Sequence, residues 1–434
     1  MQKRARRVLV VGPGTRFLSG ITYYTFSLCN ALRDAEILIH PTGALLYQAT
    51  ALHLLLQRKR LGYAGISASL SERVTVSAIL MRQLLPTALY PGRARVGASI
   101  SRLELRPSIP HYDGVDWYWG RTIVRAARFL RVQRPDTIIL QWWTGSVFHT
   151  YLVLVVLARL LGARIIIEFH EVLDTGEERI PVVRTYARLL GKTVVRQAHG
   201  FVIHSEYDRL ALEQRYNLGG RPVALIPHGP YTQYRTTDTT RAERDAPASC
   251  CNLLFFGTIR PFKGLEDLVR AFDSIPLDEI EGYWLTVVGE TWEGWTLPNE
   301  LIARSRHRDH ITFVNRYVRD EEAAVFFAGA DAVVLPYHRS SASGPLQVTM
   351  SHGLPVVVTR VGGLSEAAGR YEGAIFVPPQ DPRALRDALC QVASLKGRRF
   401  ADPHSWERTV ARYEELFDQL DRPGDRAGER GTRG

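Results

Sequence analysis

The residues best placed to do chemistry are two cations in a short, glycine-flanked segment. Arg260 and Lys263 stand three residues apart in FFGTIRPFKG, between an apolar run and the start of an expected helix. Two cations at this spacing can neutralise a diphosphate, and Gly257 and Gly264 let the backbone turn tightly around them. The alternative is an ordinary pair of solvated side chains in a loop.

A second segment, PYHRSSASGPLQVTMSHGLPVVVT, predicts an anion site at the start of a helix. Ser343 is a plausible N-cap, and Pro345 is tolerated in the first turn. The backbone N–H groups of Gly344 and Leu346 are expected to point at an anion, because the first N–H groups of a helix lack an intrahelical acceptor. An ordinary capped helix would explain the cap, but not the long run of small residues before it.

The segment VGPGTRFLSG also leads from an apolar run into a helical pattern. Its backbone N–H groups, as far as Ser19 and Gly20, can receive an anion in the same way. It is not a dinucleotide fingerprint, because GxGxxG would need a glycine where Phe17 stands and no carboxylate ends the next apolar run. A nicotinamide dehydrogenase is therefore disfavoured, and a plain tight turn is the alternative.

These segments must be positioned by alternating strands and helices. In the first half we expect strands at 8–11, 37–39, 137–140, 164–169, 201–204 and 223–226, and helices from Gly20, at 147–161 and at 182–198. In the second half we expect strands at 253–256, 284–288, 311–314, 332–335, 356–359 and 375–377, and helices from Leu265 and Glu321. Residues 61–116 sustain neither period, so no element is assigned there. The pattern predicts an α/β protein with two doubly wound parallel sheets and a ligand cleft between them.

Length and composition agree with two packed domains. The chain has 434 residues, 45% of them hydrophobic and 23% charged, and the polar stretch TTDTTRAERDAPAS resembles a linker. Its four cysteines show no metal-ligand spacing, so we expect reduced thiols. The amino terminus has too short an apolar run for an export signal, and the stretch 147–169 is broken by Arg159, Gly162 and Arg164. We therefore expect a cytoplasmic protein, with a helix followed by a buried strand at 147–169.

The net charge of +11 indicates anionic partners without choosing among nucleic acid, lipid and substrate phosphate. Arg121, Arg125, Arg128 and Arg131 fall on one face of an expected helix, after the aromatic residues at 117–119. This face, with the basic segment at 58–60, could rest against anionic lipid headgroups as a peripheral contact on the inner face of the plasma membrane. A solvated basic face is the alternative.

Four segments, GTIRPFKG, PYHRSSASG, SHGLPVVVT and VGGLSE, occur in this order and spacing. They resemble the C-terminal half of a family 4 glycosyltransferase with the GT-B fold. The first half is similar in its Ser19-Gly20 loop, in His170 of IIIEFHE, in His204-Ser205 and in Pro227-His228-Gly229. SWERTVARYEELF resembles the family's final helix, which crosses back to the first domain.

The resemblance implies an acceptor-binding domain at 1–229, a nucleotide-sugar-binding domain at 230–400 and a returning helix at 401–420. Residues 421–434 lack any apolar side chain larger than alanine or proline, so we expect a disordered tail there. The sequence departs from the family at two motif glutamates, whose positions fall on Ser340 and Val348. It resembles a branch with a PY...SG pattern that lacks the first glutamate. Because valine cannot accept a hydrogen bond from the ribose diol, Gln347 or Thr349 is the candidate to replace the second.

The resemblance implies a retaining transfer of a sugar from a nucleotide-diphosphate donor to a glycan or lipid-linked acceptor, in polysaccharide or glycoconjugate synthesis. The implied catalytic residues are His170 beside the transferred sugar and Arg260 and Lys263 at the diphosphate. Donor binding is further assigned to Gly257, Tyr317, Ser343, Gly344, Leu346 and Gln347, and an acceptor or phosphate loop to Ser19 and Gly20. A satisfied histidine at a strand end is the alternative for His170.

No metal and no cofactor are expected, since the chain contains no Asp-x-Asp tripeptide.

Two further functions compete with transfer. A nucleotide-sugar epimerase of the same fold would need acidic residues around the sugar, and a degenerate transferase that only binds a nucleotide or scaffolds a complex would fit the two lost glutamates. Nucleic-acid binding rests on charge alone, without a recognisable binding motif.

Overall fold

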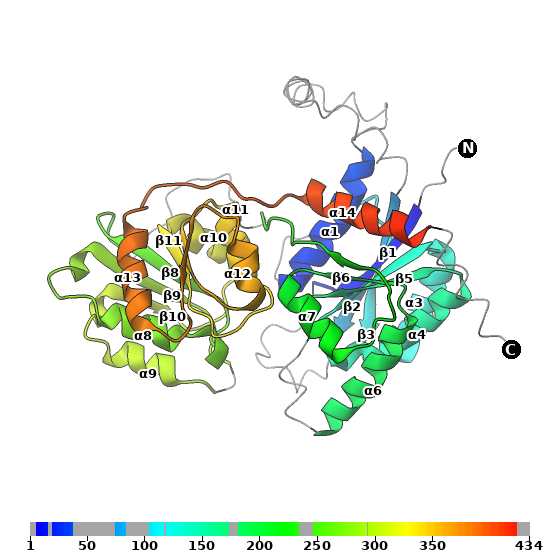
Figure 1. The fold of residues 1–434 in the computed structure, drawn as a ribbon, viewed down its shortest axis with the longest axis horizontal. Coiled ribbons are helices and arrows are strands. Elements are labelled where there is room, and N and C mark those ends of the chain that lie inside the picture. The colour runs from blue at the N-terminus through cyan, green and yellow to red at the C-terminus, as the bar shows by residue number, and fades with distance from the viewer. Residues whose placement is uncertain are drawn as a thin grey trace, which may run out of the picture.

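The structure, a computed structural model, describes residues 6–15, 20–37, 74–83, 104–116, 119–172, 181–232, 234, 246–292 and 294–422. Ser19, the basic segment at 58–60, Trp117, Tyr118 and nearly all of the expected tail lie outside these residues. Two parallel sheets, each covered by helices, form two domains side by side (Figure 1).

The first domain is built on a seven-stranded parallel sheet with the order β3-β2-β1-β4-β5-β6-β7. Its strands are β1 (Arg6–Pro13), β2 (Val74–Gln83), β3 (His111–Asp116), β4 (Thr137–Trp142), β5 (Arg164–Phe169), β6 (Gly200–Ile203) and β7 (Val223–Leu225). Its helices are α1 (Gly20–Ile37), α3 (Gly120–Gln133), η5 (Gly145–Val147), α4 (Phe148–Leu160), α6 (Pro181–Gln197) and α7 (Glu206–Arg215).

The second domain has a six-stranded parallel sheet with the order β10-β9-β8-β11-β12-β13. Its strands are β8 (Cys251–Phe256), β9 (Tyr283–Val288), β10 (Ile311–Val314), β11 (Ala332–Leu335), β12 (Val356–Thr359) and β13 (Ala374–Val377). Its helices are η6 (Pro261–Lys263), α8 (Leu265–Asp273), η7 (Ile280–Gly282), α9 (Leu297–Arg304), η8 (Arg308–His310), α10 (Asp320–Gly329), α11 (Gly344–Ser351), α12 (Gly362–Ala368) and α13 (Pro382–Ala393).

The apolar strands are buried on both faces, which is why their sequences read as continuous apolar runs. In β1, Val8 and Val10 face the core under α1, whereas Leu9 and Val11 face the core under α3, α4 and α6. The order of each sheet reverses next to its first strand, at β1/β4 and β8/β11. Ligands of such sheets bind beyond the carboxyl ends of the strands at these reversal points.

A final helix, α14 (Trp406–Leu420), returns to the first domain, where it lies beside α1 (Figure 1). The Trp406 indole donates to the carbonyl of Pro230 at 3.1 Å, and the Thr409 hydroxyl donates to that of Pro227 at 3.2 Å. The tail of the helix packs near Gly200 through Leu416 and Leu420. The helix thus ties the end of the chain to the first sheet.

The two domains also touch directly. Glu366 of α12 accepts from the backbone N–H groups of Glu206 at 2.6 Å and of Tyr207 at 2.8 Å. Both donors are in the first turn of α7, where the N–H groups have no intrahelical acceptor and the helix dipole favours a carboxylate. The Tyr23 hydroxyl of α1 donates to Asp320 of α10. These contacts set the two strand-end edges opposite each other.

The expected elements are largely confirmed, with two corrections. Ile37, expected to open a strand at 37–39, is the last residue of α1, and the next described strand is β2. The range 61–116, where no element was expected, contains β2 and β3. The stretch 147–169 is a helix followed by a buried strand, as expected. Among the described residues, no helix combines the length and apolar composition that crossing a bilayer requires.

Candidate functional site

Three histidines meet where neighbouring strands of the first sheet end. His170 follows β5, His204 follows β6, and His228 comes three residues after β7. Because β5, β6 and β7 are adjacent and parallel, their carboxyl ends deliver all three rings to one place. The ring centres of His204 and His228 are 4.0 Å apart, and those of His170 and His204 are 4.7 Å apart.

The hydrogen bonds of two of these rings define their orientation. His204 Nδ1 pairs with the carbonyl oxygen of Ile226 at 2.8 Å, and since a carbonyl can only accept, His204 Nδ1 is the donor. In the neutral ring, His204 Nε2 is then an acceptor, and it receives the Nδ1–H of His170 at 3.1 Å. This leaves His170 Nε2 buried without a protein partner, and both ring nitrogens of His228 are in the same state.

A buried carboxyl group lies behind the histidines. Glu168 of β5 is fully buried, 4.0 Å from His170 Nε2 and 3.7 Å from His204 Nε2. The Tyr413 hydroxyl of α14 donates to Glu168, and Gln141 Nε2 of β4 donates to it at 3.3 Å. The Tyr24 hydroxyl of α1 lies 3.3 Å from that of Tyr413. This network links α14 to the sheet directly beneath the proposed site.

Burial decides the charge of these groups. It lowers the pKa of His170 and of His228 well below the usual value, and that of His204 to about 4. Burial also raises the pKa of Glu168 to about 7, against the hydrogen bonds that favour the carboxylate. The first domain therefore offers neutral imidazoles, which can bind hydroxyl groups without adding charge.

The second domain supplies the opposite wall, and this wall is cationic. Lys263 ends η6, with its Nζ 3.7 Å from the centre of the Tyr337 ring, and the Arg339 guanidinium lies 4.6 Å from the centre of the Phe262 ring. Gly264 adopts a left-handed conformation at φ 63°, and a Cβ there would lie 2.0 Å from the Pro336 carbonyl oxygen. A glycine is thus required for the turn that carries Lys263.

The start of α11 adds backbone groups to this wall. The Ser343 side chain caps the helix by accepting from the N–H of Leu346 at 3.3 Å. The Leu346 N–H is therefore engaged by the cap, and its side chain is fully buried, which corrects the expectation that this N–H points freely at an anion. Gly344, which is partly buried, lines the pocket at this turn, and Gln347 Oε1 is buried nearby without a protein partner.

The two walls enclose one pocket between the domains. The first domain contributes Gly20, His170 and His228, and the second contributes Lys263, Arg339, residues 340–344 and Gln347. Tyr231, in the connection between the domains, also lines this pocket. Polar atoms without protein partners, on His170, His228 and Gln347, thus belong to residues that line the same space. Buried polar groups are normally paired, so their convergence indicates a ligand that supplies the missing hydrogen bonds.

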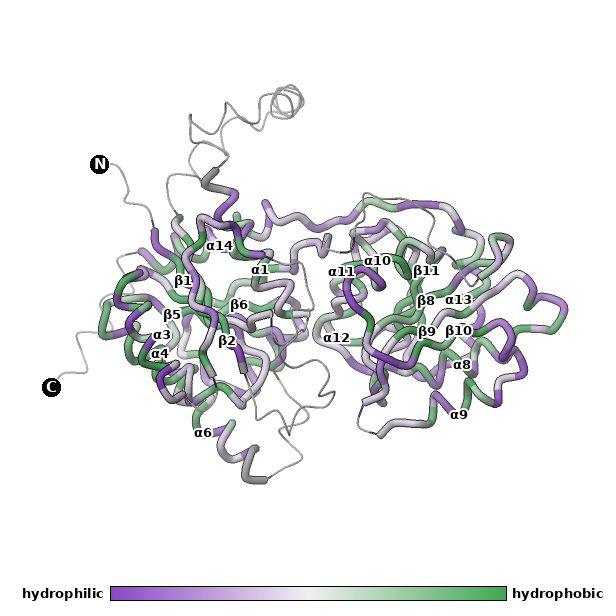
Figure 2. The backbone as a smooth tube through the Cα atoms, turned by 180° about the vertical axis from the view of Figure 1, so that it is seen from behind, coloured by the Kyte–Doolittle hydropathy of each residue, from purple (hydrophilic) through white to green (hydrophobic). Residues whose placement is uncertain are grey.

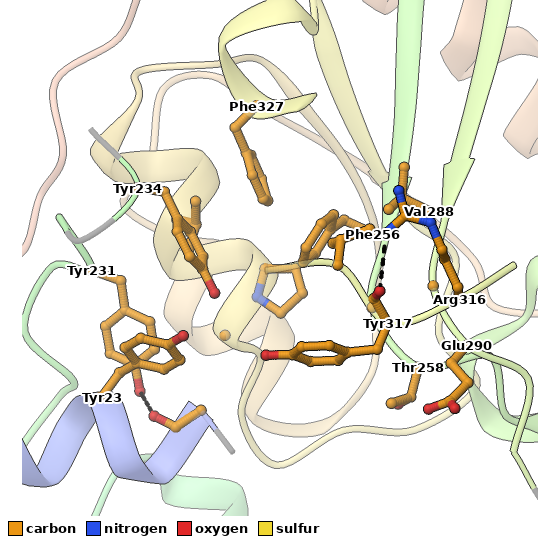
Figure 3. Close-up of a pocket in the computed structure, with 17 residues that line it drawn as sticks. Tyr23, Tyr231, Tyr234, Phe256, Thr258, Val288, Glu290, Arg316, Tyr317 and Phe327 are labelled. Atoms are coloured by element: carbon orange, nitrogen blue, oxygen red, sulfur yellow. Dashed lines mark hydrogen bonds between the residues drawn. The ribbon is translucent and has the colours of Figure 1, made fainter. Parts of the chain in front are cut away.

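A second, more aromatic pocket adjoins the first and shares Gly20, Tyr231 and Gly344 with it. Figure 3 shows Tyr23, Tyr231 and Tyr234 on one side of it and Tyr317 and Glu290 on the other. The rings of Tyr234 and Phe327 are nearly parallel, with an interplanar angle of 10° and centres 6.0 Å apart. Val348 lies in this pocket and Ser340 in the first. Flat aromatic walls of this kind suit a planar base.

The structure distributes the expected site residues over both pockets. His170, Lys263, Ser343 and Gln347 line the first, and Gly257 and Tyr317 line the second. Gly20 and Gly344 line both. Arg260 caps η6, with its guanidinium 5.1 Å from the centre of the Phe262 ring, and is not among the lining residues of either pocket. Ser19 lies outside the described residues.

Sequence reasoning missed several residues of the site. Arg339 stands in the same small-residue segment as Ser343, and its positive charge could have marked it as a candidate anion-binding residue. His204 and His228 were noted in motifs but not assigned to the site, although both stand at expected strand ends. The roles of Glu168 and Tyr413 could not be predicted from the sequence, because the hydrogen bond between them joins residues 245 positions apart.

The three histidines are also a possible metal-binding group. Their potential ligand atoms all lie within 4.8 Å of one another, and neutral imidazole is the form that binds zinc and similar ions. In the structure, one of these atoms, His204 Nε2, already accepts the hydrogen bond from His170. A metal would have to replace that bond.

Comparisons with known proteins place this geometry in context. The family model described as "Glycosyl transferase 4-like domain" matches residues 19–229, and that described as "Glycosyl transferases group 1" matches residues 250–394. The D-inositol 3-phosphate glycosyltransferase of Corynebacterium urealyticum is 26% identical over 57% of this chain and 62% of its own length. The O-antigen chain mannosyltransferase B of Escherichia coli is 27% identical over 36% of this chain and 42% of its own length. The chain thus spans less than two thirds of these relatives.

Two solved structures share the fold over almost the whole chain. Sucrose-phosphate synthase from Thermosynechococcus elongatus superposes with a TM-score of 0.63 at 16% identity, covering 96% of this chain and 99% of that one. Anabaena HepE, solved in complex with UDP and glucose, gives a TM-score of 0.59 at 12% identity with the same coverage. The expectation of two doubly wound parallel sheets is confirmed.

The charge of Glu168 generates a prediction about stability. Because its pKa is raised in the folded state, the fold retains a proton that the unfolded chain loses, so Glu168 makes the protein less stable as pH rises from 4.5 to about 7. The histidines act oppositely, since the pKa of His204 is lowered to about 4. In Glu168→Gln only the histidines contribute to this pH dependence. We therefore expect the free energy of unfolding of the variant, relative to that of wild type, to increase by up to about 3 kcal/mol as pH rises from 4.5 to about 7.

Urea denaturation of both proteins at a series of pH values measures this difference. The substitution Glu372→Gln, at an exposed glutamate, is the matched control and should give a difference that does not vary with pH. A constant difference for Glu168→Gln as well would mean that Glu168 is already ionised throughout the range.

Proposed function

Because the chain belongs to family 4 of the glycosyltransferases and has the GT-B fold, we propose that it transfers a hexosyl group from a nucleotide-diphosphate donor to a glycan or lipid-linked acceptor. The observation that carries this proposal is the pocket in which cations from one domain face neutral imidazoles with unpaired ring nitrogens from the other. A sugar diphosphate has a charged part and a neutral, hydroxyl-rich part. The two walls match these two parts.

The donor's diphosphate would lie against the second domain. Lys263, Arg339 and the turn at Gly344 border this part of the pocket, and Arg260 stands three residues before Lys263. When the bond between the anomeric carbon and the phosphate oxygen breaks, its electron pair stays on the leaving nucleotide. Fixed cations and backbone N–H groups stabilise that charge without reorganising. Lys263, which lines the pocket, is therefore assigned to the leaving group, and Arg260 is assigned to it on the family resemblance.

The transferred sugar would lie against the first domain. His170 Nε2 and the two ring nitrogens of His228 are unpaired polar atoms on this wall, and sugar hydroxyls can both donate to and accept from such groups. The nucleoside would occupy the adjoining aromatic pocket, beside Tyr317 and Gly257. Val348 in that pocket cannot accept from a ribose hydroxyl, and Gln347, the candidate to replace it, lines the adjoining first pocket.

The acceptor would enter from the first domain, beside Gly20. An acceptor hydroxyl then forms the new bond to the anomeric carbon and gives up its proton, and we propose that the configuration of that carbon is retained. The names of the relatives support transfer to a phosphorylated or chain-forming acceptor, because one acts on an inositol phosphate and the other on an O-antigen chain. Neither an epimerase nor a binding scaffold is favoured by these comparisons.

The division of the chain stays a proposal: residues 1–229 bind the acceptor, 230–400 bind the donor, and 401–420 return to the first domain. We also propose a cytoplasmic site of action. All four cysteines are free, as is usual in a reducing compartment.

We expect Lys263→Ala and Arg260→Ala each to lower kcat at least about tenfold, because each removes a cation from the developing charge on the leaving group. Arg304→Ala, at an exposed arginine of α9, is the matched control and should retain wild-type turnover. Donor hydrolysis and sugar transfer are measured by release of the nucleoside diphosphate. Wild-type rates in both variants would contradict the assignment of Lys263 and Arg260 to the donor diphosphate.

We also expect chelation by EDTA to leave activity unchanged, because protein cations and backbone groups meet the leaving-group charge in place of a metal. The assay compares chelated enzyme with enzyme supplied with Mg²⁺, Mn²⁺ or Zn²⁺. Activity that is lost on chelation and restored by one of these ions would contradict metal independence. Loss of that restoration in His228→Ala would then identify the histidines as the ligands.

A further inference from the structure

Three neighbouring helices of the first domain share an unusual surface. Helices α3, α4 and α6 cover the same face of the first sheet, with α4 between the other two, and both views place α3 and α4 on the side away from the second domain (Figures 1 and 2). We call the exposed side of these helices the α3–α4–α6 face. It is separate from the pocket between the domains.

This face is rich in exposed apolar side chains. The described part of the chain has ten large hydrophobic residues that are exposed, and six of them are on or directly after these helices. They are Val124 and Val132 on α3, Val156 and Leu160 on α4 with Leu161 next to it, and Leu189 on α6. Leu160 is 79% exposed and Val132 70% exposed. Single exposed apolar residues need no explanation, but this concentration marks an interaction surface.

The charges of the face all have one sign. The three helices carry nine Arg and Lys residues and no Asp or Glu. The cations are Arg121, Arg125, Arg128 and Arg131 on α3, Arg159 on α4, and Arg184, Arg188, Lys192 and Arg196 on α6, and all nine are exposed. These helices therefore account for nine of the eleven net positive charges of the chain.

We propose that the α3–α4–α6 face is a docking surface for an anionic lipid bilayer, which it contacts without crossing. The combination of exposed leucine and valine with cations identifies the partner by its chemistry. Lipid headgroups neutralise the arginines, and the acyl boundary accepts the apolar side chains between them. A nucleic-acid backbone would satisfy the cations but leave the leucines in water.

The spacing on the helices fits this geometry. On α3 the four arginines recur every three or four residues, and on α6 the four cations recur every four residues, so each set forms a line along one side of its helix. Arginine and lysine can lay their apolar stems against the bilayer surface while their charges stay at the headgroups. Among these three helices, the sequence predicted a basic surface on α3 alone. The structure shows that α4 and α6 add further cations to this surface, and that exposed apolar side chains lie among them.

The lipid-docking proposal does not depend on the transferase proposal. The α3–α4–α6 face contains none of the residues assigned to the pocket, so transfer to a water-soluble acceptor should not depend on this face. If the chain proved not to be a transferase, the lipid contact could still be measured. If the lipid contact failed, transfer would be unaffected.

Binding of the full-length protein to vesicles tests the proposal. Cosedimentation is measured with vesicles of phosphatidylcholine alone and with vesicles containing about 30% phosphatidylglycerol. We expect binding only to the anionic vesicles, and release in about 0.5 M NaCl, because salt at that concentration screens surface charges beyond a few ångströms. Equal binding to both vesicle types, or to neither, would overturn the proposal, as would binding to duplex DNA tighter than to the vesicles.

Two variants with matched controls separate the contributions of charge and apolar contact. The charge variant is R121Q/R125Q/R128Q/R131Q, and its control removes four exposed arginines of the second domain, R304Q/R370Q/R383Q/R399Q. The apolar variant is L160S/L189S, and its control is L277S/V325S, at exposed positions of the second domain. We expect both face variants to weaken binding at least about tenfold and both controls to bind like wild type. Equal weakening by a variant and its control would contradict a specific lipid face.

All five proteins are also assayed for sugar transfer to a water-soluble acceptor and for thermal unfolding. Unchanged melting temperatures and turnover show that a loss of vesicle binding comes from the surface rather than from misfolding. Should the charge variant prove unstable, R184Q/R188Q on α6 provides a second test of the same face.

Discussion

The proposed site depends on holding two separate sheets with their strand ends opposite each other, because each domain supplies only half of the pocket. Glu366 of α12 does part of this by accepting two N–H groups at the start of α7. The other part comes from α14, which leaves the second domain, crosses to the first and places Tyr413 against Glu168. A carboxylate at a helix amino terminus is favourable, because the first N–H groups lack intrahelical acceptors and the helix dipole attracts the negative charge. The return helix adds a second connection between the domains.

The distribution of charge follows from burial. Protonated histidines facing Lys263 and Arg339 would repel them, and would repel one another at ring separations of 4.0 to 5.5 Å. Burial lowers the pKa of each imidazole, and the same burial raises the pKa of Glu168 to about 7. At the pocket, the first domain therefore presents neutral imidazoles, while Lys263 and Arg339 of the second domain supply the positive charge. This division suits a ligand with a neutral sugar and an anionic diphosphate.

The sequence was sufficient for the parts of the fold that follow a simple pattern. Buried parallel strands give continuous apolar runs, and the Ser343 cap could be identified from residue type and position. β2 and β3 were missed for physical reasons: β2 changes from alternating to continuous burial along its length, and the edge strand β3, HYDGVD, has Val115 as its one deeply buried hydrophobic residue. Glu168 looked like any strand residue, because its role is fixed by Tyr413 from the far end of the chain. His228 could have been found, since it completes a row of histidines after three successive strands.

The central claim is that the pocket binds a nucleotide-diphosphate sugar as one unit, with the diphosphate against the cations and the sugar against the histidines. Thermal unfolding of the full chain with UDP-, GDP- and TDP-sugars tests it most directly, because a ligand that binds only the folded state raises the melting temperature. The account predicts that at least one of these donors raises it, and by more than the matching nucleoside diphosphate or the free sugar does alone. If no donor raised the melting temperature, or if the nucleoside without phosphates raised it as much as the complete donor, the assignment of the pocket would be contradicted.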